Sequence, residues 1–313
     1  MISAILPPMT VGSATTELHR LRDAVEDELR GFLTDRRAAM VALAERAAAP
    51  VDELVRLTEA GGSRLRALCC CLGHRAAGGL DGPPIHRAGA ALELLHLMAL
   101  IHDDLMDRSA SRRGVPASHV AFADAARAAG HADPDHAGRA LAILAGDLAA
   151  VLADQLLLGA GFPTERLAPA LARYHEMRLA MAAGQYLDVT AGEAGGLARG
   201  NETGPAAGAR RLAALKGGSY SVGGPLSIGA ILAGGSPQVL AALDRVGGPL
   251  GLAFQLRDDL RDGDAAAGVT AAEVEALVAE AKAALEPGAL EPVSLEPGAV
   301  GALMALADRV GER

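Results

Sequence analysis

Apolar residues recur at helical spacing along most of the chain. The repeat of three to four residues runs through five long segments: 86–106, 138–158, 166–190, 207–232 and 238–262. No stretch alternates between apolar and polar residues as a half-buried strand would. Helix starts are expected where a capping residue lies next to a proline, at Asp133-Pro134, Pro163-Thr164 and Ser236-Pro237. The pattern therefore predicts an all-α protein.

The length of 313 residues suits one large core, so we expect a single all-α domain, a helical bundle over 1–313. Positions 1–16 are expected to be loosely ordered, and the glycine-rich segment 190–208 is typical of a flexible loop. A helix is expected at 271–285. The prolines of two Glu-Pro-Gly triplets then predict a kinked connector before a last short helix at 299–310.

Composition and charge exclude several classes of protein. Half of the residues are hydrophobic and the formal net charge is −9, which disfavours nucleic acid as a partner because phosphates attract Lys and Arg. Cys69, Cys70 and Cys71 are consecutive, which fits neither a zinc site nor a disulfide framework. We expect them to be buried apolar side chains in a reducing compartment. Without a membrane-length apolar run or a signal peptide, the chain is expected to be cytoplasmic with no membrane span.

Two acidic motifs interrupt the apolar pattern. Residues 103–107 read Asp-Asp-Leu-Met-Asp and residues 258–262 read Asp-Asp-Leu-Arg-Asp. Carboxylates four positions apart share one helix face, where they repel each other unless a cation lies between them. Oxygen ligands of this kind suit Mg²⁺, which binds through one or two carboxylates plus substrate phosphates. We expect the motifs to form opposing walls of one metal site, the alternative being two solvated acidic turns.

An arginine pair follows the first acidic motif. Gly114 and Pro116 are expected to end the helix, which would leave Arg112 and Arg113 at its C-terminal edge. Guanidinium groups beside metal-holding carboxylates can bind a diphosphate through paired, charge-assisted hydrogen bonds. The two patterns together predict a site for a diphosphate and its metal ions.

This combination of motifs resembles the trans-isoprenyl diphosphate synthases, the family of farnesyl, geranylgeranyl and longer-chain synthases. The likeness runs from about Gly61 to Asp262. Both acidic motifs match the family's aspartate-rich motifs. Four further segments match the family pattern. Glu93–His96 precedes the first acidic motif, Gly184–Asp188 and Lys216–Tyr220 lie between the two motifs, and Phe254–Gln255 leads into the second.

The resemblance implies a Mg²⁺-dependent prenyltransferase, with three ions around the bound diphosphate, that joins an allylic diphosphate to isopentenyl diphosphate and works as a homodimer. The implied metal ligands are Asp103, Asp107, Asp258 and Asp262. Asp104, Asp259 and Lys216 complete the implied catalytic set. Isopentenyl diphosphate would be held by Arg66, His96 and Arg113. The other implied substrate contacts are Arg112, Gln185, Lys216, Phe254 and Gln255.

Product length should depend on the helix turn before the first acidic motif. In the family, bulky aromatic residues four and five positions before that motif stop the growing chain. Ala99 and Met98 occupy these positions here, with Leu95 one turn deeper. None is aromatic, so the resemblance implies products longer than C15, with C20 geranylgeranyl diphosphate expected.

Two departures from the family pattern keep other functions open. Ser63 stands where the family has a lysine in Gly-Gly-Lys-x-x-Arg, and the loop after Asp262 is shortened and lacks the family's Gly-Lys elements. Losing one charged hydrogen bond weakens binding by about 1.5–3 kcal/mol. The alternatives are a non-catalytic or regulatory subunit of a heteromeric synthase and a related allylic-diphosphate lyase or cyclase. With no Trp, four Phe and three Tyr, the chain offers few aromatic faces to steer a carbocation.

Overall fold

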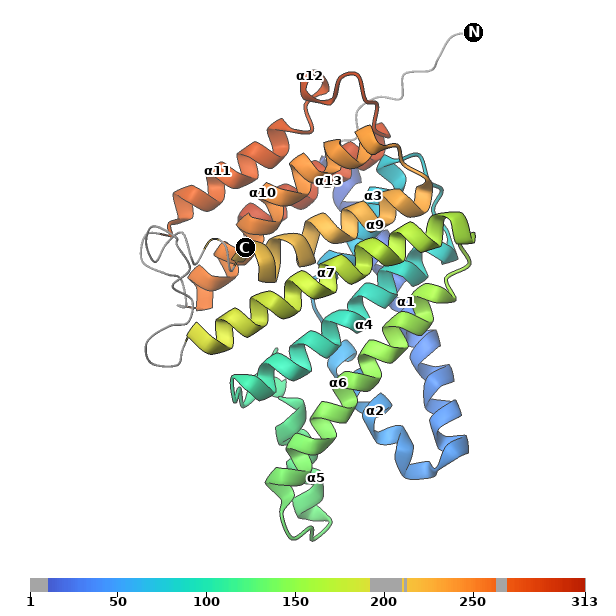
Figure 1. Cartoon of the computed structure of the whole chain (residues 1–313), viewed down its shortest axis with the longest axis vertical. Coiled ribbons are helices and arrows are strands. Elements are labelled where there is room, and N and C mark those ends of the chain that lie inside the picture. Colours follow the sequence, from blue (N-terminus) through green and yellow to red (C-terminus); the bar gives the residue numbers. More distant parts are fainter. Residues whose placement is uncertain (1–10, 192–209, 211–212, 263–268, 313) are drawn as a thin grey trace. The chain divides into compact units, whose positions relative to one another are not determined.

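The computed structural model describes residues 11–191, 210, 213–262 and 269–312. Helices dominate these residues (Figure 1), which confirms the predicted all-α class. The chain divides into two compact units, of which unit 1 comprises Met1–Arg22, Leu65–Ile85 and Phe162–Arg313, and unit 2 comprises Asp23–Arg64 and His86–Gly161. The expectation of a single domain stays a prediction, and each unit is described by itself.

Unit 2 is built around α6. Its elements are most of α1 (Val11–Leu43), η1 (Glu45–Ala48), α2 (Ala49–Glu59), most of α4 (Pro83–Met106), β1 (Ser111–Arg112), β2 (Val115–Pro116), α5 (Ser118–Ala128) and α6 (Pro134–Leu158). Both α2 and α5 pack against α6. The contact with α5 is close, because a Cβ on Gly138 would overlap the backbone of His119. Glycine at 138 therefore sets how near the two helices lie.

Unit 1 is built around α3. Its elements are the first part of α1, α3 (Leu65–Ala76), the first residues of α4, α7 (Thr164–Ala191), the π-helix η2 (Ala214–Gly223), α9 (Gly224–Ala233), α10 (Pro237–Asp262), α11 (Ala271–Ala283), α12 (Pro287–Leu290) and α13 (Pro297–Glu312). Nearly every residue of α3 is buried. A Cβ on Gly73 would overlap the carbonyl oxygen of Leu226, and one on Gly229 would overlap that of Cys70. Helices α3 and α9 therefore touch backbone to backbone.

The three consecutive cysteines lie on α3. All three are free thiols and fully buried, as predicted. Burial raises the pKa of the Cys70 and Cys71 thiols, so both stay protonated and unreactive in the folded protein.

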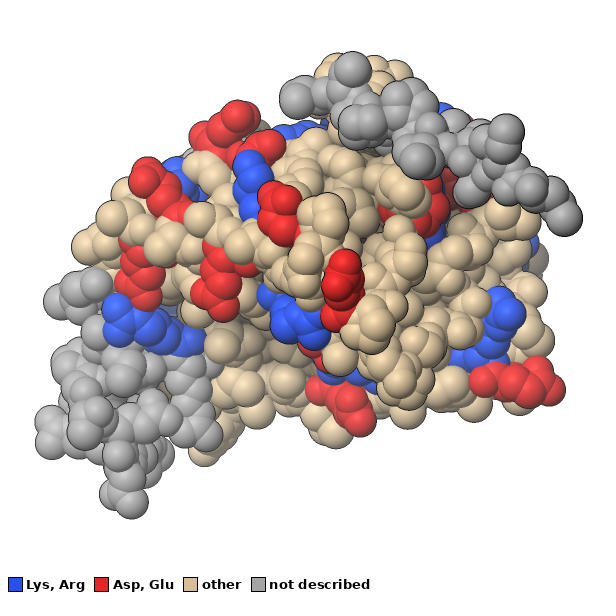
Figure 2. Space-filling view, turned by 90° about the horizontal axis from the view of Figure 1, so that it is seen from above, with Lys and Arg blue, Asp and Glu red and all other residues tan. Residues whose placement is uncertain are grey.

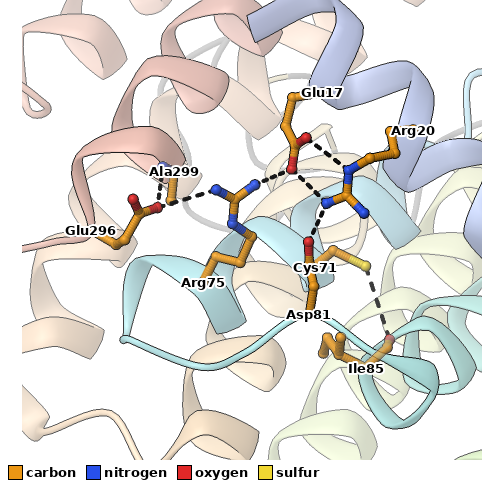
Figure 3. Close-up of polar contacts among 8 residues, drawn as sticks. All are labelled: Glu17, Arg20, Cys71, Arg75, Asp81, Ile85, Glu296 and Ala299. Atoms are coloured by element: carbon orange, nitrogen blue, oxygen red, sulfur yellow. Dashed lines mark hydrogen bonds and ion pairs between the residues drawn. The ribbon is translucent and has the colours of Figure 1, made fainter. Parts of the chain in front are cut away.

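A chain of ion pairs joins α1, α3 and α13 within unit 1 (Figure 3). Glu17 on α1 accepts a hydrogen bond from Arg20 at 2.7 Å and pairs with Arg75 of α3. Arg75 also lies 3.4 Å from Glu296, whose carboxylate accepts bonds of 2.8 and 2.6 Å from two backbone N–H groups in the first turn of α13. Hydrogen bonding from Arg20 lowers the pKa of Glu17. The network fastens both ends of the described chain to α3.

Most predicted helices are confirmed with small shifts at their ends. The predicted caps are confirmed at Asp133, which accepts from the His136 N–H at 3.0 Å, and at Ser236, which accepts from the Val239 N–H at 3.3 Å. Helix α7 begins at Thr164 as expected. Segment 207–232 differs, because the π-helix η2 precedes α9 in it.

Several boundary predictions were wrong. Residues 11–16, expected to be loosely ordered, belong to α1. Helix α4 ends at Met106, and a short hairpin appears where no strand was expected. Pro287 and Pro297 begin α12 and α13, because the fixed φ of proline suits a first helical turn. The first two residues of the loop predicted at 190–208 belong to α7. The rest of that loop lies outside the described residues, as do residues 263–268 of the shortened loop.

Helix α6 is the one described helix long and apolar enough to cross a membrane. Only the length and the apolar composition of α6 suggest a membrane span, and a core helix of a helical bundle has the same length and composition. Part of α6 is buried, and the helix packs against α2 and α5, as a core helix does.

Candidate functional site

The first acidic motif closes α4. Asp103 and Asp104 lie in its last turn, and Asp107 follows directly, with its N–H bonded to the Asp103 carbonyl at 2.9 Å. This bond continues the helical register, so Asp103 and Asp107 share a face as expected. The Asp103 side chain is 25% exposed and Asp107 is exposed, whereas the Asp104 side chain is only 3% exposed. The three carboxylates therefore differ in burial: Asp103 and Asp107 reach solvent, whereas Asp104 does not.

Arg112 folds back onto this motif from the hairpin. Its Nε and Nη2 donate to Asp104 Oδ1 at 2.8 and 2.5 Å, and its Nη2 lies 3.3 Å from Asp103 Oδ2. Burial raises the pKa of Asp104, an effect that the Arg112 hydrogen bonds oppose. Asp104 thus anchors Arg112 beside the two open carboxylates. The hairpin turn itself is Arg113-Gly114, both with positive φ, the geometry of a two-residue turn.

Arg113 joins the hairpin to the Gly-Gly loop of unit 2. Its Nη1 donates to the carbonyl oxygen of Gly61. Gly62 has φ of 146°, and a Cβ there would lie 2.8 Å from Arg113 Nη1. Glycine at 62 therefore leaves the space in which the guanidinium rests.

A buried ion cluster surrounds Arg64 and was not predicted from the sequence. The Arg64 side chain is 4% exposed, its Nε donates to Glu26 at 3.0 Å, and its Nη2 donates to the Thr58 carbonyl at 2.7 Å. Glu93, also buried, lies 3.9 Å away. Arg64 has a φ of 53°, so the backbone is in the left-handed region at the residue whose charged side chain is buried. The only sequence signal was a charged residue inside the Gly-Gly motif, since Glu26 lies far away in the chain.

The second acidic motif lies in the last turns of α10, in unit 1. The Asp258 side chain is 44% exposed and lies 3.3 Å from Arg261. Gln255 donates to Asp259 Oδ1 at 2.7 Å, one turn apart, and so orients that carboxylate. Phe254 is half-buried beside it. The side chain of Asp262 lies outside what the structure describes.

The segment that carries Lys216 is the π-helix η2, and it packs against α10 and α7. A Cβ on Gly251 of α10 would overlap the backbone of Gly218, so η2 and α10 also meet backbone to backbone. π-Helical turns are rare and frequently mark functional sites. The structure thus brings the Lys216 segment to the helix of the second motif, although the Lys216 side chain itself is not described. Gln185 lies half-buried on α7.

The remaining predicted site residues lie on two elements, α3 and α4. Arg66 is buried in the first turn of α3, in unit 1. His96, Met98 and Ala99 are half-buried on α4, and Leu95 is fully buried. The first motif, its arginines and His96 belong to unit 2, whereas Arg66, η2 and the second motif belong to unit 1. That the two motifs face each other therefore stays a prediction.

The donor set fits Mg²⁺ better than a metal held by protein alone. No group of three or more His, Cys, Asp or Glu residues is arranged for an ion within the described ranges. The solvent-accessible side chains of Asp103, Asp107 and Asp258 are carboxylates, which suit a cation that also takes phosphate oxygens and water. On the face shown in Figure 2, Lys and Arg are scattered, mostly beside Asp or Glu.

Comparison with known proteins identifies the family. The sequence model of the polyprenyl synthetase family matches residues 49–273. The chain is 35% identical to a short chain isoprenyl diphosphate synthase of Methanothermobacter thermautotrophicus over 67% of this chain and 58% of that protein. It is 34% identical to the farnesyl diphosphate synthase of Geobacillus stearothermophilus over 66% of this chain and 64% of that protein. These matches span less than two thirds of either relative.

The fold agrees with this assignment. The crystal structure of a geranylgeranyl pyrophosphate synthase from Corynebacterium glutamicum, complexed with isoprenyl diphosphate and magnesium, superposes with a TM-score of 0.72 at 30% identity, covering 94% of this chain and 88% of that one. The chain belongs to the polyprenyl synthetase family.

Proposed function

We propose that the chain is a Mg²⁺-dependent trans-prenyltransferase that condenses an allylic diphosphate with isopentenyl diphosphate. One observation carries the proposal: two solvent-accessible carboxylates, Asp103 in the last turn of α4 and Asp107 just after it, lie near Arg112, which buried Asp104 anchors. This arrangement supports a site that combines metal-binding carboxylates with a fixed positive charge, as binding of a diphosphate requires. Family membership supports the same reading.

The residues of the chain have distinct parts in this reaction. Asp103, Asp107, Asp258 and Asp262 would hold Mg²⁺, which supplies Lewis-acid stabilisation of the departing diphosphate. Arg112 and Lys216 would add positive charge where negative charge develops. Gln255 orients the carboxylate of Asp259 in the second motif.

The second substrate needs separate positive charge. Arg66, His96 and Arg113 would hold the diphosphate of isopentenyl diphosphate, with Gln185 and Phe254 as further substrate contacts. The departing diphosphate can accept the proton released after the new bond forms, so the reaction needs no side chain as base. Ser63, in the place of a lysine, makes the remaining arginines more important for this substrate.

The finer properties follow from the same site. Ala99 and Met98 leave the turn before the first motif free of aromatic rings, which supports products longer than C15, with C20 expected. A homodimer is supported by the exposed apolar stripe along α6, formed by Ile143, Leu144, Val151 and Leu158. We also propose that the protein is cytoplasmic and does not span a membrane.

Assay of the purified chain with Mg²⁺, isopentenyl diphosphate and each allylic diphosphate tests the proposal. Asp103→Ala and Asp258→Ala should each reduce turnover by more than the roughly 10–100-fold typical of residues that only support a metal ligand. Asp124→Ala, which removes an exposed carboxylate from α5, is the matched control and should keep wild-type turnover.

Each other outcome has a distinct meaning. Turnover that appears only with a partner protein would indicate a subunit of a heteromeric synthase. Diphosphate release without consumption of isopentenyl diphosphate would indicate a lyase or cyclase. Near-normal turnover by either aspartate variant would contradict the proposed metal site.

A further inference from the structure

Arg66 carries a positive charge into the interior of unit 1. The residue is 8% exposed, in the first turn of α3. Its Nη2 donates a hydrogen bond of 2.8 Å to Ser221 Oγ, and its guanidinium carbon lies 4.4 Å from the centre of the Tyr220 ring. Within the described residues, Arg66 has no carboxylate partner, and its Nε has no hydrogen-bond partner.

A buried cation without a carboxylate is unusual. Burial of an unpaired charge is unfavourable, and proteins normally offset it with an ion pair or a bound ligand. The Tyr220 ring offsets part of this through its π-face, and Ser221 satisfies one N–H. A guanidinium has five N–H donors arranged to bind phosphate oxygens in pairs, so the unused donors of Arg66 are suited to an anion.

Tyr220 and Ser221 are held firmly in place. Both lie in η2, with 3% and 1% exposure, and η2 packs against α3 and α10. The backbone contact between α3 and α9 fixes the helix that carries Arg66. The ring covers one face of the guanidinium while the hydroxyl holds one edge, which leaves the other in-plane donors for a ligand.

We infer that Tyr220 and Ser221 are positioning residues that hold the Arg66 guanidinium for the diphosphate of the isopentenyl substrate. The inference rests on the proposed function for the identity of that substrate. Contact with a diphosphate, however, can be measured without turnover, so the two can fail separately.

Calorimetric titration of the full chain with inorganic diphosphate in EDTA tests the inference, because EDTA keeps divalent cations off the carboxylates. Ser221→Ala and Tyr220→Leu should each raise the Kd for diphosphate about tenfold, and Arg66→Met should raise it further. In the Arg66→Met background, Ser221→Ala should have no additional effect, since it acts only through the guanidinium.

A matched control removes a neighbouring buried hydroxyl. Ser227 on α9 bonds to the Gly223 carbonyl at 2.9 Å and to Asp244 at 3.0 Å. Ser227→Ala should therefore alter thermal stability but keep the wild-type Kd for diphosphate. In turnover assays, Ser221→Ala should raise KM for isopentenyl diphosphate about tenfold while kcat and KM for the allylic substrate stay unchanged.

The inference is overturned if wild type fails to bind diphosphate in EDTA, if Ser221→Ala binds as wild type does, or if its effect persists without Arg66. Circular dichroism checks folding, and Ser221→Ala decides the result if the larger change at Tyr220 prevents folding. If Ser221→Ala weakens diphosphate binding only when Arg66 is present, but the wild type has no turnover, the inference stands and the proposed function is wrong. If the wild type has turnover, but Ser221→Ala does not weaken diphosphate binding through Arg66, the proposed function stands and the inference is wrong.

Discussion

At the scale of single residues, neighbouring side chains of one motif have different roles because their burial differs. Asp103 and Asp104 are adjacent in sequence, yet one is open and the other is buried against Arg112. A helix turns about 100° per residue, so adjacent aspartates must point in different directions. A buried carboxylate that anchors an arginine is thus part of the motif, in addition to the metal ligands.

Ala99→Phe should shorten the product. Phenylalanine at 99 would place a ring one turn before Asp103, along the path proposed for the growing chain. Chromatography of the products should show a shift from C20 toward C15 or shorter, with little change in the rate of the first condensation. Leu43→Phe, at an exposed position at the end of α1, is the control and should leave product length unchanged. A wild type that makes only C10 or C15, or an Ala99→Phe variant with unaltered products, would contradict the assignment.

The sequence predicted the site residues that are spaced regularly and missed those that meet through folding. The helical spacing of Asp103 and Asp107 is local, so it could be anticipated. The contact between Arg64 and Glu26 joins distant positions, and no local pattern encodes it. The same holds for the ring of Tyr220 beneath Arg66, which depends on how η2 packs on α3.

At the scale of helices, glycines determine which elements can touch. Gly73 on α3 and Gly229 on α9 each lie against a partner backbone, whereas Gly248 on α10 has nothing within 4 Å of its Cβ position. Close packing of this kind tolerates little added volume.

Gly73→Ala and Gly229→Ala should each destabilise the protein by about 1–3 kcal/mol, because the new methyl group must displace backbone. Gly248→Ala should be neutral or stabilising by up to about 1 kcal/mol, since alanine favours a helix where space allows. Chemical denaturation of the three variants measures the difference. Equal stability for all three would show that α3 and α9 do not touch as described.

Glu17→Gln should weaken the protein in a pH-dependent way. The pKa of Glu17 in the folded chain lies below its ordinary value of 4.5, because Arg20 and Arg75 favour its charged form. Its stabilising effect is therefore fully present above pH 4.5 and is lost as the pH falls through the lower folded value. The difference in Tm between wild type and Glu17→Gln should be largest near neutral pH and shrink below pH 4.5. Glu280→Gln, at an exposed position on α11, should show no such trend.

Helix type and helix starts were predictable, whereas the hairpin and the π-helix were not. Periodicity and caps such as Asp133 act within a few residues, so sequence reveals them. Strands of two residues show no alternation, so β1 and β2 left no pattern. A π-helix such as η2 keeps a helical composition, and only its hydrogen bonds distinguish it.

At the scale of the whole molecule, the apolar stripe on α6 should mediate self-association. Val151 is 61% exposed and Leu144 is 57% exposed, which is more apolar surface than a solvated helix usually presents. A two-fold pair is the commonest closed assembly.

Val151→Lys should shift the protein from dimer to monomer in light scattering at micromolar concentration, because a lysine in an apolar interface would be buried without a partner. Leu80→Lys changes another exposed apolar residue, at 86% exposure in a loop, and should leave the dimer intact. A monomeric wild type would rule out the homodimer. Dissociation by both variants would show that the effect is not specific to α6.

The buried cysteines allow local opening of unit 1 to be measured by thiol labelling. All three thiols of the sequence lie on α3, the helix that both α1 and α13 are fastened to. A thiol reagent can reach them only when unit 1 opens, so the rate of labelling measures how often that opening occurs. A diphosphate that binds Arg66 in the folded protein should slow the labelling, because it stabilises the folded form. The degree of slowing would report substrate binding without any radioactive or fluorescent ligand.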